Sequence, residues 1–177
     1  MYHPRKVFAA TSLIAFCTLP VVLGLYVQQL GLFDPFPVGK KFPSLREFSI
    51  DKDAGILRGP SHNKLLLLFF TPECSHCRTE IGHLNELSAK YISDIDIIGV
   101  SLDDRQATDA LKKELNLKIP IHLADPEKLR NVFKLSILPA LFCIDESHTL
   151  RRFSIGEHSS AFDEALIREF IVSKTEN

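Results

Sequence analysis

The sequence predicts a three-layer α/β domain built on a central mixed β-sheet and preceded by one N-terminal transmembrane helix. Continuous apolar runs of strand length occur at 64–70, 96–101 and 140–144, and such runs fit strands that are covered on both faces. Segments with apolar residues at helical spacing lie between them. A late strand pair and a terminal amphipathic segment follow, which completes an alternation typical of α/β domains.

The composition is that of one globular domain. The chain has 177 residues, of which 45% are hydrophobic and 24% are charged, and these values exclude a disordered or fibrous protein. Lys and Arg number 21 and Asp and Glu number 22, for a net charge of -1. A nucleic-acid-binding protein would carry a basic excess, so we expect no nucleic-acid partner. Four cysteines are too few for a disulfide scaffold, and their spacing does not fit a paired zinc motif.

The N-terminal region predicts an uncleaved membrane anchor. No charged side chain occurs between Val7 and Phe33, and a helix of about 20 residues spans a bilayer core. Pro20 lies inside this segment, and membrane helices tolerate proline where neighbouring groups satisfy the freed carbonyl. A cleaved signal peptide is the alternative, but residues 24–27 end in bulky side chains and offer no small-x-small cleavage site. We therefore expect an anchor over 7–30.

Charges and prolines around this segment predict how the rest of the chain is arranged. Arg5 and Lys6 favour a cytoplasmic N-terminus over 1–6, although two lysines lie beyond the other end of the anchor. We therefore expect a single-pass protein of the cytoplasmic (inner) membrane, with its folded domain on the periplasmic or extracytoplasmic side. Prolines in 31–41 predict a stiff, extended linker. The folded domain then covers 42–174.

In the first half of the domain, a strand over 64–70 is followed by a break at Thr71-Pro72-Glu73. A helix then begins near Cys74, and a second strand over 96–101 and a second helix follow. Residues at helical spacing, most of them apolar, predict the buried face of each helix. These residues are Ile81, Leu84, Leu87, Ser88 and Tyr91 in the first helix, and Ala107, Ala110, Leu111 and Leu115 in the second.

The second half predicts a strand over 119–123 and a helix that starts at Asp125-Pro126, with proline in its first turn. A strand over 140–144 follows Pro139, and a strand over 150–155 pairs with it across a turn near Glu146-Ser147. A helix closes the domain. The expected inner residues are Leu129, Val132 and Phe133 in the first of these helices, and Phe162, Ala165, Leu166 and Phe170 in the last.

The motif Cys74-Ser75-His76-Cys77 stands where a buried strand gives way to a helix. The first turn of a helix has unpaired N–H groups and the positive end of the dipole, and both stabilise a thiolate at Cys74. Cys77 lies one turn further along, close enough to form a disulfide with Cys74. A protonated His76 would add positive charge beside the pair, whereas Glu73 would oppose it.

With Leu138-Pro139 placed before the next strand, this motif resembles that of the thioredoxin-fold oxidoreductases. The anchor, the entry over 38–43 and the insertion around Asp125-Pro126 make the chain similar to their membrane-anchored TlpA/ResA-like branch, over residues 38 to 172. The resemblance implies a thiol-disulfide oxidoreductase that needs no cofactor. Its partners would be protein thiols or disulfides and a transmembrane electron donor or reoxidase.

The resemblance also implies roles for individual residues. Leu138-Pro139 would be a cis-proline bond facing the redox pair, and the Leu138 backbone would pair with an extended substrate. Cys74 would attack a substrate disulfide and Cys77 would resolve the mixed disulfide. Glu80, where this branch often has a carboxylate, would exchange a proton with Cys77.

Three positions depart from the family pattern. Glu73 replaces the tryptophan that commonly precedes the first cysteine, and Gly82 stands where a proline is common. His76, second in the middle dipeptide, resembles the more oxidising members of the superfamily. The residues themselves leave the direction of electron flow open, and the resemblance favours reduction.

A peroxiredoxin-like thiol peroxidase that uses Cys74 is the main alternative. Thr71 stands three residues before Cys74, as a peroxidatic threonine would, but Leu67 occupies the place of that family's proline. The peroxiredoxin family also has an arginine downstream of this cysteine, and Arg151 or Arg152 would supply it. A redox-inactive, membrane-tethered binding domain is a third alternative, and the intact cysteine pair argues against it.

Metal and haem sites built on the motif are incomplete. No second Cys-x-x-Cys or spaced histidine pair completes a zinc site, and Arg78 stands where a haem-attachment motif needs histidine. We therefore expect no metal ligand among the site residues. Cys143 in its apolar strand and Cys17 in the anchor are expected to be buried apolar residues. His122, His148 and His158 are expected at the surface or in turns.

Overall fold

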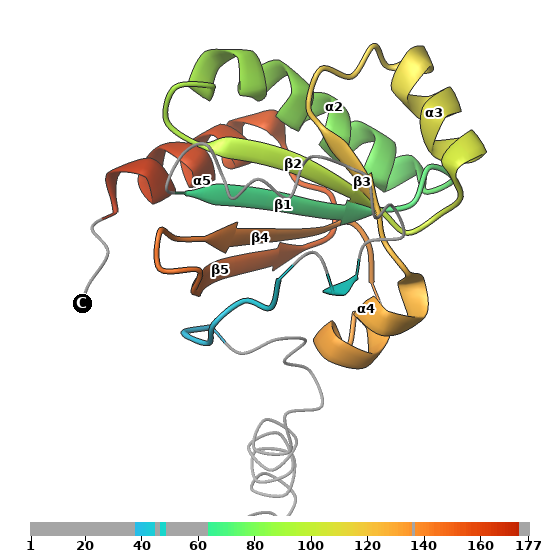
Figure 1. The fold of residues 1–177 in the computed structure, drawn as a ribbon. Coiled ribbons are helices and arrows are strands. Elements are labelled where there is room, and N and C mark those ends of the chain that lie inside the picture. Colours follow the sequence, from blue (N-terminus) through green and yellow to red (C-terminus); the bar gives the residue numbers. More distant parts are fainter. Residues whose placement is uncertain (1–37, 45–46, 49–63, 136, 174–177) are drawn as a thin grey trace, which may run out of the picture. The chain divides into compact units, whose positions relative to one another are not determined.

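The computed structural model describes residues 38–44, 47–48, 64–135 and 137–173, and it confirms the predicted α/β architecture around a mixed sheet (Figure 1). The five strands lie in the order β3-β2-β1-β4-β5. β1 pairs in parallel with β2, and β2 with β3, whereas β4 is antiparallel to both β1 and β5. The strands are β1 (Leu65–Phe70), β2 (Asp96–Ser101), β3 (Ile121–Leu123), β4 (Ala140–Ile144) and β5 (Leu150–Ile155).

Helices cover both faces of this sheet. They are α2 (Ser75–Tyr91), α3 (Arg105–Glu114), α4 (Pro126–Phe133) and α5 (Ser160–Val172). α2, α3 and α5 contribute buried residues to one apolar cluster, and α4 contributes to a second cluster on the opposite face. All of the described residues fall within one compact unit. The anchor predicted over 7–30 lies outside the described residues, and among the described ones no helix is long and apolar enough to cross a bilayer.

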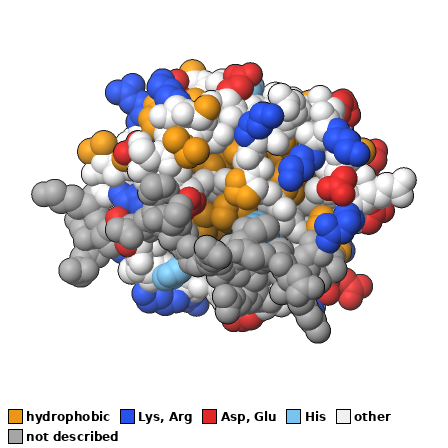
Figure 2. Space-filling view, turned by 45° about the horizontal axis from the view of Figure 1, so that its top comes forward, with side chains coloured by type: hydrophobic (Ala, Val, Ile, Leu, Met, Phe, Trp, Pro, Cys, Tyr) orange, Lys and Arg blue, Asp and Glu red, His pale blue; other side chains and the backbone are white. Residues whose placement is uncertain are grey.

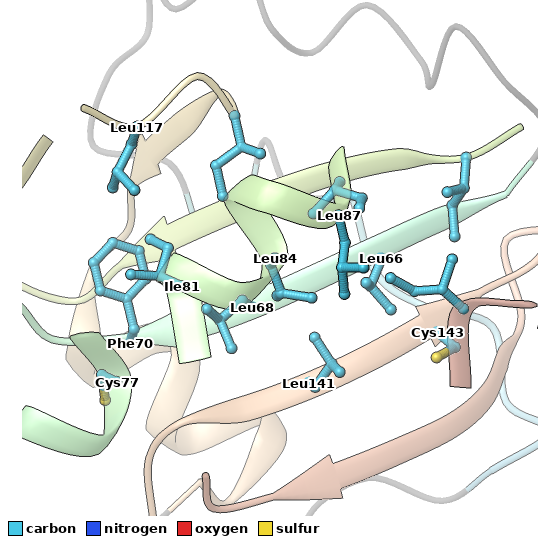
Figure 3. Close-up of a cluster of buried hydrophobic side chains, with 14 of the residues drawn as sticks. Leu66, Leu68, Phe70, Cys77, Ile81, Leu84, Leu87, Leu117, Leu141 and Cys143 are labelled. Atoms are coloured by element: carbon cyan, nitrogen blue, oxygen red, sulfur yellow. The ribbon is translucent and has the colours of Figure 1, made fainter. Parts of the chain in front are cut away.

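The central position of β1 in the sheet explains why its sequence is an unbroken apolar run. Successive side chains of a strand point to opposite faces, so Leu66, Leu68 and Phe70 enter the α2 side of the core while the alternate residues enter the α4 side. Figure 3 shows the α2-side cluster, in which Cys143 of β4 also takes part. Cys143 is buried, as predicted. The burial of both faces requires every residue of the strand to be apolar.

The predicted helix faces are correct in α2 and need correction elsewhere. Val132 is 41% exposed and Phe162 is 46% exposed. In α4 the inward positions are four residues apart, at Leu129 and Phe133, so Val132 lies at the flank. In α3 the inward residues are Thr108 and Leu111, rather than the two alanines. The inward residues of α5 are Asp163, Ile167 and Phe170.

Three further observations refine the sequence predictions. His122 lies in β3 and is buried, so its expected surface position is wrong. Residues 39–42, at the predicted boundary between linker and domain, hydrogen-bond to the β4–β5 hairpin: Gly39 N–H donates to Leu150 O, and Phe42 N–H to His148 O. On the face shown in Figure 2, Lys and Arg side chains are interspersed with Asp and Glu.

Lys64, just before β1, joins the start of the sheet to the end of α5. Its buried ammonium donates to the carbonyls of Phe170, Ile171 and Ser173 at 2.7, 2.9 and 2.6 Å. A cation at a helix C-terminus satisfies carbonyls that have no intrahelical partner and complements the helix dipole. These contacts explain why a lysine occupies a buried position.

We expect Lys64→Met to lower the free energy of unfolding by about 2 kcal/mol, because the hydrogen bonds from a charged group to three carbonyls are lost. Chemical denaturation of the two proteins measures the difference. Lys128→Met is the matched control, since Lys128 is exposed and lies 4.0 Å from Asp125; its effect should stay within about 0.5 kcal/mol. Equal effects of the two substitutions would contradict the capping role.

Candidate active site

Cys74 is the N-cap residue of α2. Its backbone is extended, with φ -79° and ψ 115°, and its sulfur accepts the backbone N–H of Cys77 at 3.3 Å. The turn that brings it there is closed by the Cys74 N–H, which donates to Thr71 O at 3.2 Å. An N-cap thiolate can accept the otherwise unpaired N–H groups of the first helical turn. The prediction that Cys74 opens the helix is confirmed.

Cys77 is a fully buried thiol in the first turn of α2 (Figure 3). Burial raises the pKa of Cys77 to about 12, with further contributions from the hydrogen bond to Cys74 and from the negative charge of Glu80. At neutral pH Cys77 is therefore protonated. The half-buried Cys74 is consequently the cysteine of the pair that outside reagents reach first.

The Leu138-Pro139 peptide bond is cis, as predicted. The Leu138 carbonyl faces the redox pair, with its oxygen 4.0 Å from Cys74 Sγ. Pro139 begins the approach to β4, and its carbonyl accepts the N–H of Gly156 at 2.8 Å. The chain segment opposite the cysteines is thus fixed by β4 and by the end of β5.

His76 is directed toward Glu157 and into solvent. Its side chain is 70% exposed, and Nδ1 lies 2.5 Å from Glu157 Oε2. The Glu157 carboxylate places a negative charge directly beside the imidazole. Any influence of His76 on the cysteines therefore depends on Glu157, which the sequence analysis did not consider.

Glu80 is fully buried on the inner side of α2. His158 holds it through two contacts: the His158 backbone N–H donates to Oε2 at 2.8 Å, and His158 Nδ1 lies 3.2 Å from Oε1. His158, which was expected at the surface or in a turn, lies in the segment between β5 and α5, and its side chain is only 17% exposed. Glu80 is also close enough for its charge to raise the pKa of Cys77.

Asp163 of α5 is a second fully buried carboxylate in this region. Burial raises the pKa of Asp163 to about 6, and the charge of Glu80 adds to this. His83 Nδ1 lies 3.4 Å from Asp163 Oδ2. Oxygen or nitrogen atoms of Glu80, His158 and Asp163 all lie within 4.8 Å of one another. Sequence reasoning missed His158, Asp163 and His83, because their proximity depends on the packing of α5 against α2.

The arginines that the peroxidase alternative requires lie elsewhere. Arg151 forms an ion pair with Asp145, and Arg152 forms one with Glu169 at 2.7 Å. Arg152 pairs with Cys143 of β4. Cys143 lies three residues along the strand from Ala140, the residue next to the cis-proline. At about 3.4 Å per strand residue, Arg152 is therefore about 10 Å along the sheet from the cis-proline end of β4. The geometry around Cys74 therefore favours disulfide exchange.

The environments of the described cysteines predict selective alkylation. In the reduced protein at pH 7, iodoacetamide should modify Cys74 and leave Cys77 and Cys143 unmodified, because burial raises the pKa of both to about 12 and the thiolate is the reacting form. Peptide mass mapping before and after denaturation measures this. Reactivity at Cys77 should rise only as the pH approaches 12. Equal labelling of Cys74 and Cys77 at neutral pH would contradict the burial argument.

Comparison with known proteins supports this geometry. The model of the AhpC/TSA family matches residues 38–153, which is more than half of the chain and includes the cysteine pair, the cis-proline and most of β5. The chain belongs to the AhpC/TSA family. A curated relative of this AhpC/TSA protein is the thiol-disulfide oxidoreductase ResA of Bacillus cereus, 24% identical over 161 residues, 90% of this chain and 92% of the relative.

Solved structures share the fold of this AhpC/TSA protein. StoA from Bacillus subtilis superposes with a TM-score of 0.53 and 21% identity, over 61% of this chain and 81% of StoA. The thioredoxin domain of a thiol-disulfide oxidoreductase from Bacteroides vulgatus gives a TM-score of 0.64 at 15% identity, over 77% of this chain and 99% of that domain. The fold is thioredoxin-like, as predicted, and the Cys-x-x-Cys pair is that of a thiol-disulfide oxidoreductase.

Proposed function

We propose that the protein reduces disulfides of other proteins outside the cytoplasmic membrane, with Cys74 as the attacking thiol and Cys77 as the resolving thiol. One observation carries the proposal: Cys74 caps α2 beside the carbonyl that precedes a cis-proline, while Cys77 is buried behind it. That arrangement exposes one sulfur to a substrate and protects the second until a mixed disulfide has formed.

The exchange proceeds in two balanced steps. The Cys74 thiolate attacks one sulfur of the substrate disulfide, an S–S bond forms between them, and the other substrate sulfur leaves as a thiolate. Cys77 then loses its proton and attacks Cys74, which releases the second substrate thiol and leaves a Cys74–Cys77 disulfide. Glu80 is the buried carboxylate proposed to take the Cys77 proton, since its charge reaches that thiol. His76 is proposed to tune the pair from its exposed position beside Glu157.

The substrate segment is proposed to lie along the backbone at Leu138. The Leu138 carbonyl faces Cys74, and Ile137 beside it presents an exposed apolar side chain. An extended segment that hydrogen-bonds to this backbone would place its own disulfide at Cys74 without reading a particular sequence. This binding mode supports protein disulfides as the substrate class.

The membrane arrangement of the protein is part of the same proposal. Residues 7–30 are proposed as a single anchor with 1–6 in the cytoplasm, 31–41 as the linker, and the oxidoreductase domain on the far side. Cytosolic thiols cannot cross the membrane, so a transmembrane electron donor would re-reduce Cys74–Cys77. Protease treatment of intact spheroplasts should digest the domain; protection of residues 42–174 would overturn the proposed orientation.

Steady-state assays and a redox titration test the activity and its direction. The full-length protein should catalyse reduction of insulin disulfides by a dithiol and show little turnover of hydrogen peroxide. Equilibration of the Cys74–Cys77 pair with thiol buffers should give a potential nearer to about -270 mV than to about -120 mV, the values of a reducing and of an oxidising protein with the thioredoxin fold. Rapid peroxide turnover would favour the thiol peroxidase instead. A high potential with an oxidised resting state would show that the protein oxidises its substrates. The absence of any reversible disulfide couple would favour the redox-inactive binding domain.

A further inference from the structure

Two carboxylates and two imidazoles form a buried polar cluster between α2 and α5, behind the cysteine pair. Its members are Glu80 and His83 of α2, His158 before α5, and Asp163 of α5. Both carboxylates are fully buried, and the two histidines are mostly buried. Two neighbouring carboxylates removed from water repel each other, so they require a shared proton, or positive charge between or beside them.

One distance in the cluster matches that between two ligands of the same metal ion. His158 Nδ1 lies 3.2 Å from Glu80 Oε1. Zinc bonds to nitrogen and oxygen are about 2.0–2.1 Å long, so two ligands in a tetrahedral site lie about 3.3–3.4 Å apart. The ligand atoms of Glu80, His158 and Asp163 all lie within 4.8 Å of one another, so small side-chain rotations bring them around one ion.

Asp163 is the member of the cluster that most needs a further partner. Neither of its carboxylate oxygens accepts a hydrogen bond from any described residue, although both are buried. His83 Nδ1, which faces it, likewise has no hydrogen-bond partner in the described part of the chain. Leaving buried polar atoms unpaired is costly, and a cation bound to Asp163 removes that cost for the carboxylate.

Glu80 and His158 are already oriented as ligands would be. The second nitrogen of His158, Nε2, lies 2.7 Å from Ser154 Oγ, and the ring stacks on Phe162 with centroids 4.6 Å apart. Metal-binding histidines are typically fixed by such a contact at their other nitrogen. The His158 backbone N–H holds Glu80 Oε2 at 2.8 Å. Nδ1 and Oε1 therefore face the cluster.

We propose that this cluster is a zinc site, with Glu80, His158 and Asp163 as ligands and solvent in the fourth position. His83 is a positioning residue, because its Nδ1 lies 3.4 Å from Asp163 Oδ2. The imidazole donor favours zinc over Mg²⁺ and Ca²⁺, which take oxygen ligands. The sequence analysis expected no metal ligand because it considered sites built on the cysteines.

Metal titration of a full-length Cys74→Ser/Cys77→Ser variant tests the proposal without the two redox thiols, so its failure leaves the proposed redox function untouched. With a chelating dye as competitor, we expect one Zn²⁺ per chain and no displacement by excess Mg²⁺. Adding Asp163→Asn or His158→Gln should weaken zinc binding more than about tenfold, and His83→Gln by about tenfold. Glu164→Gln is the matched control, because Glu164 is the next residue of α5 and pairs with Lys90; it should bind zinc as the parent does.

Thermal unfolding gives a second measurement that also reports folding. Zinc should raise the melting temperature of the parent and the Glu164→Gln control relative to chelator-treated samples, because an ion that binds only the folded state stabilises it. Asp163→Asn should fold, since the amide removes a buried charge, and should show no zinc-dependent shift. Zinc binding that is unchanged by Asp163→Asn, binding that appears only with the cysteines intact, or no binding at micromolar zinc would each overturn the proposal.

Discussion

Replacing Cys74 with serine is expected to abolish catalysed disulfide reduction, and replacing Cys77 is expected to stop the reaction half-way. Serine at position 74 presents a hydroxyl that forms no bond with a substrate sulfur, so turnover should fall to the uncatalysed background. In Cys77→Ser the first attack still occurs, because Cys74 keeps its place at the N-cap of α2. The mixed disulfide then has no resolving thiol.

Insulin-reduction rates and non-reducing electrophoresis measure the two outcomes. Cys77→Ser should accumulate one covalently attached substrate per chain, which a dithiol releases, whereas Cys74→Ser should accumulate none. Cys143→Ala is the matched control, since Cys143 is buried within β4, and it should keep parental turnover. Trapping by Cys74→Ser, or full turnover in either variant, would contradict the assigned order of attack.

The strands could be predicted well because each is identified by the apolar residues of its own short segment. β2 has the predicted bounds, and β1 begins one residue later than predicted, at Leu65. The strand predicted over 119–123 is shorter because Pro120 has no N–H to donate; its carbonyl accepts from Gly99, and the ladder starts at Ile121. Apolar residues on both faces are sufficient to identify a strand, whereas its ends depend on individual hydrogen bonds.

The buried faces of the helices were harder to predict, because a short amphipathic helix has too few apolar residues to show which side of it faces the core. In α5 the aromatic Phe162 suggested one face, but the inward stripe is Asp163, Ile167 and Phe170. Asp163 was not assigned to the core because an acidic residue is almost always exposed. Phe162 stacks on His158 instead of entering the core.

The redox pair could be predicted from sequence, but the groups around it could not. Cys74 and Cys77 are identified by a short local motif, the cis bond at Leu138-Pro139 is implied by the family resemblance, and their geometry is as expected. Glu80 meets His158, which lies 78 residues away along the chain, and no pattern in one sequence pairs them. The available signal was spacing: a glutamate and a histidine three residues apart on α2, and an aspartate in register with the apolar residues of α5.

The largest expected effect on stability is that of Phe142→Ala. Phe142 is fully buried in the middle of β4, and its ring centroid lies 5.2 Å from that of Phe69 and 5.8 Å from that of Phe133. Through these contacts it joins β1 to α4 on the face of the sheet opposite α2. Truncation removes the buried ring and leaves a cavity among rigid neighbours, which costs about 3–5 kcal/mol.

Chemical denaturation of the full-length protein should therefore show a much lower midpoint for Phe142→Ala at an unchanged slope. Val132→Ala on α4 is the control, because Val132 is largely exposed and its loss should change the free energy of unfolding by no more than about 0.5 kcal/mol. Equal midpoints for the two variants would show that the aromatic cluster does not hold α4 against the sheet. Leu138-Pro139 lies between α4 and β4, and Leu138 packs against the same cluster. Equal midpoints would therefore also contradict the idea that this cluster fixes Leu138-Pro139 opposite Cys74.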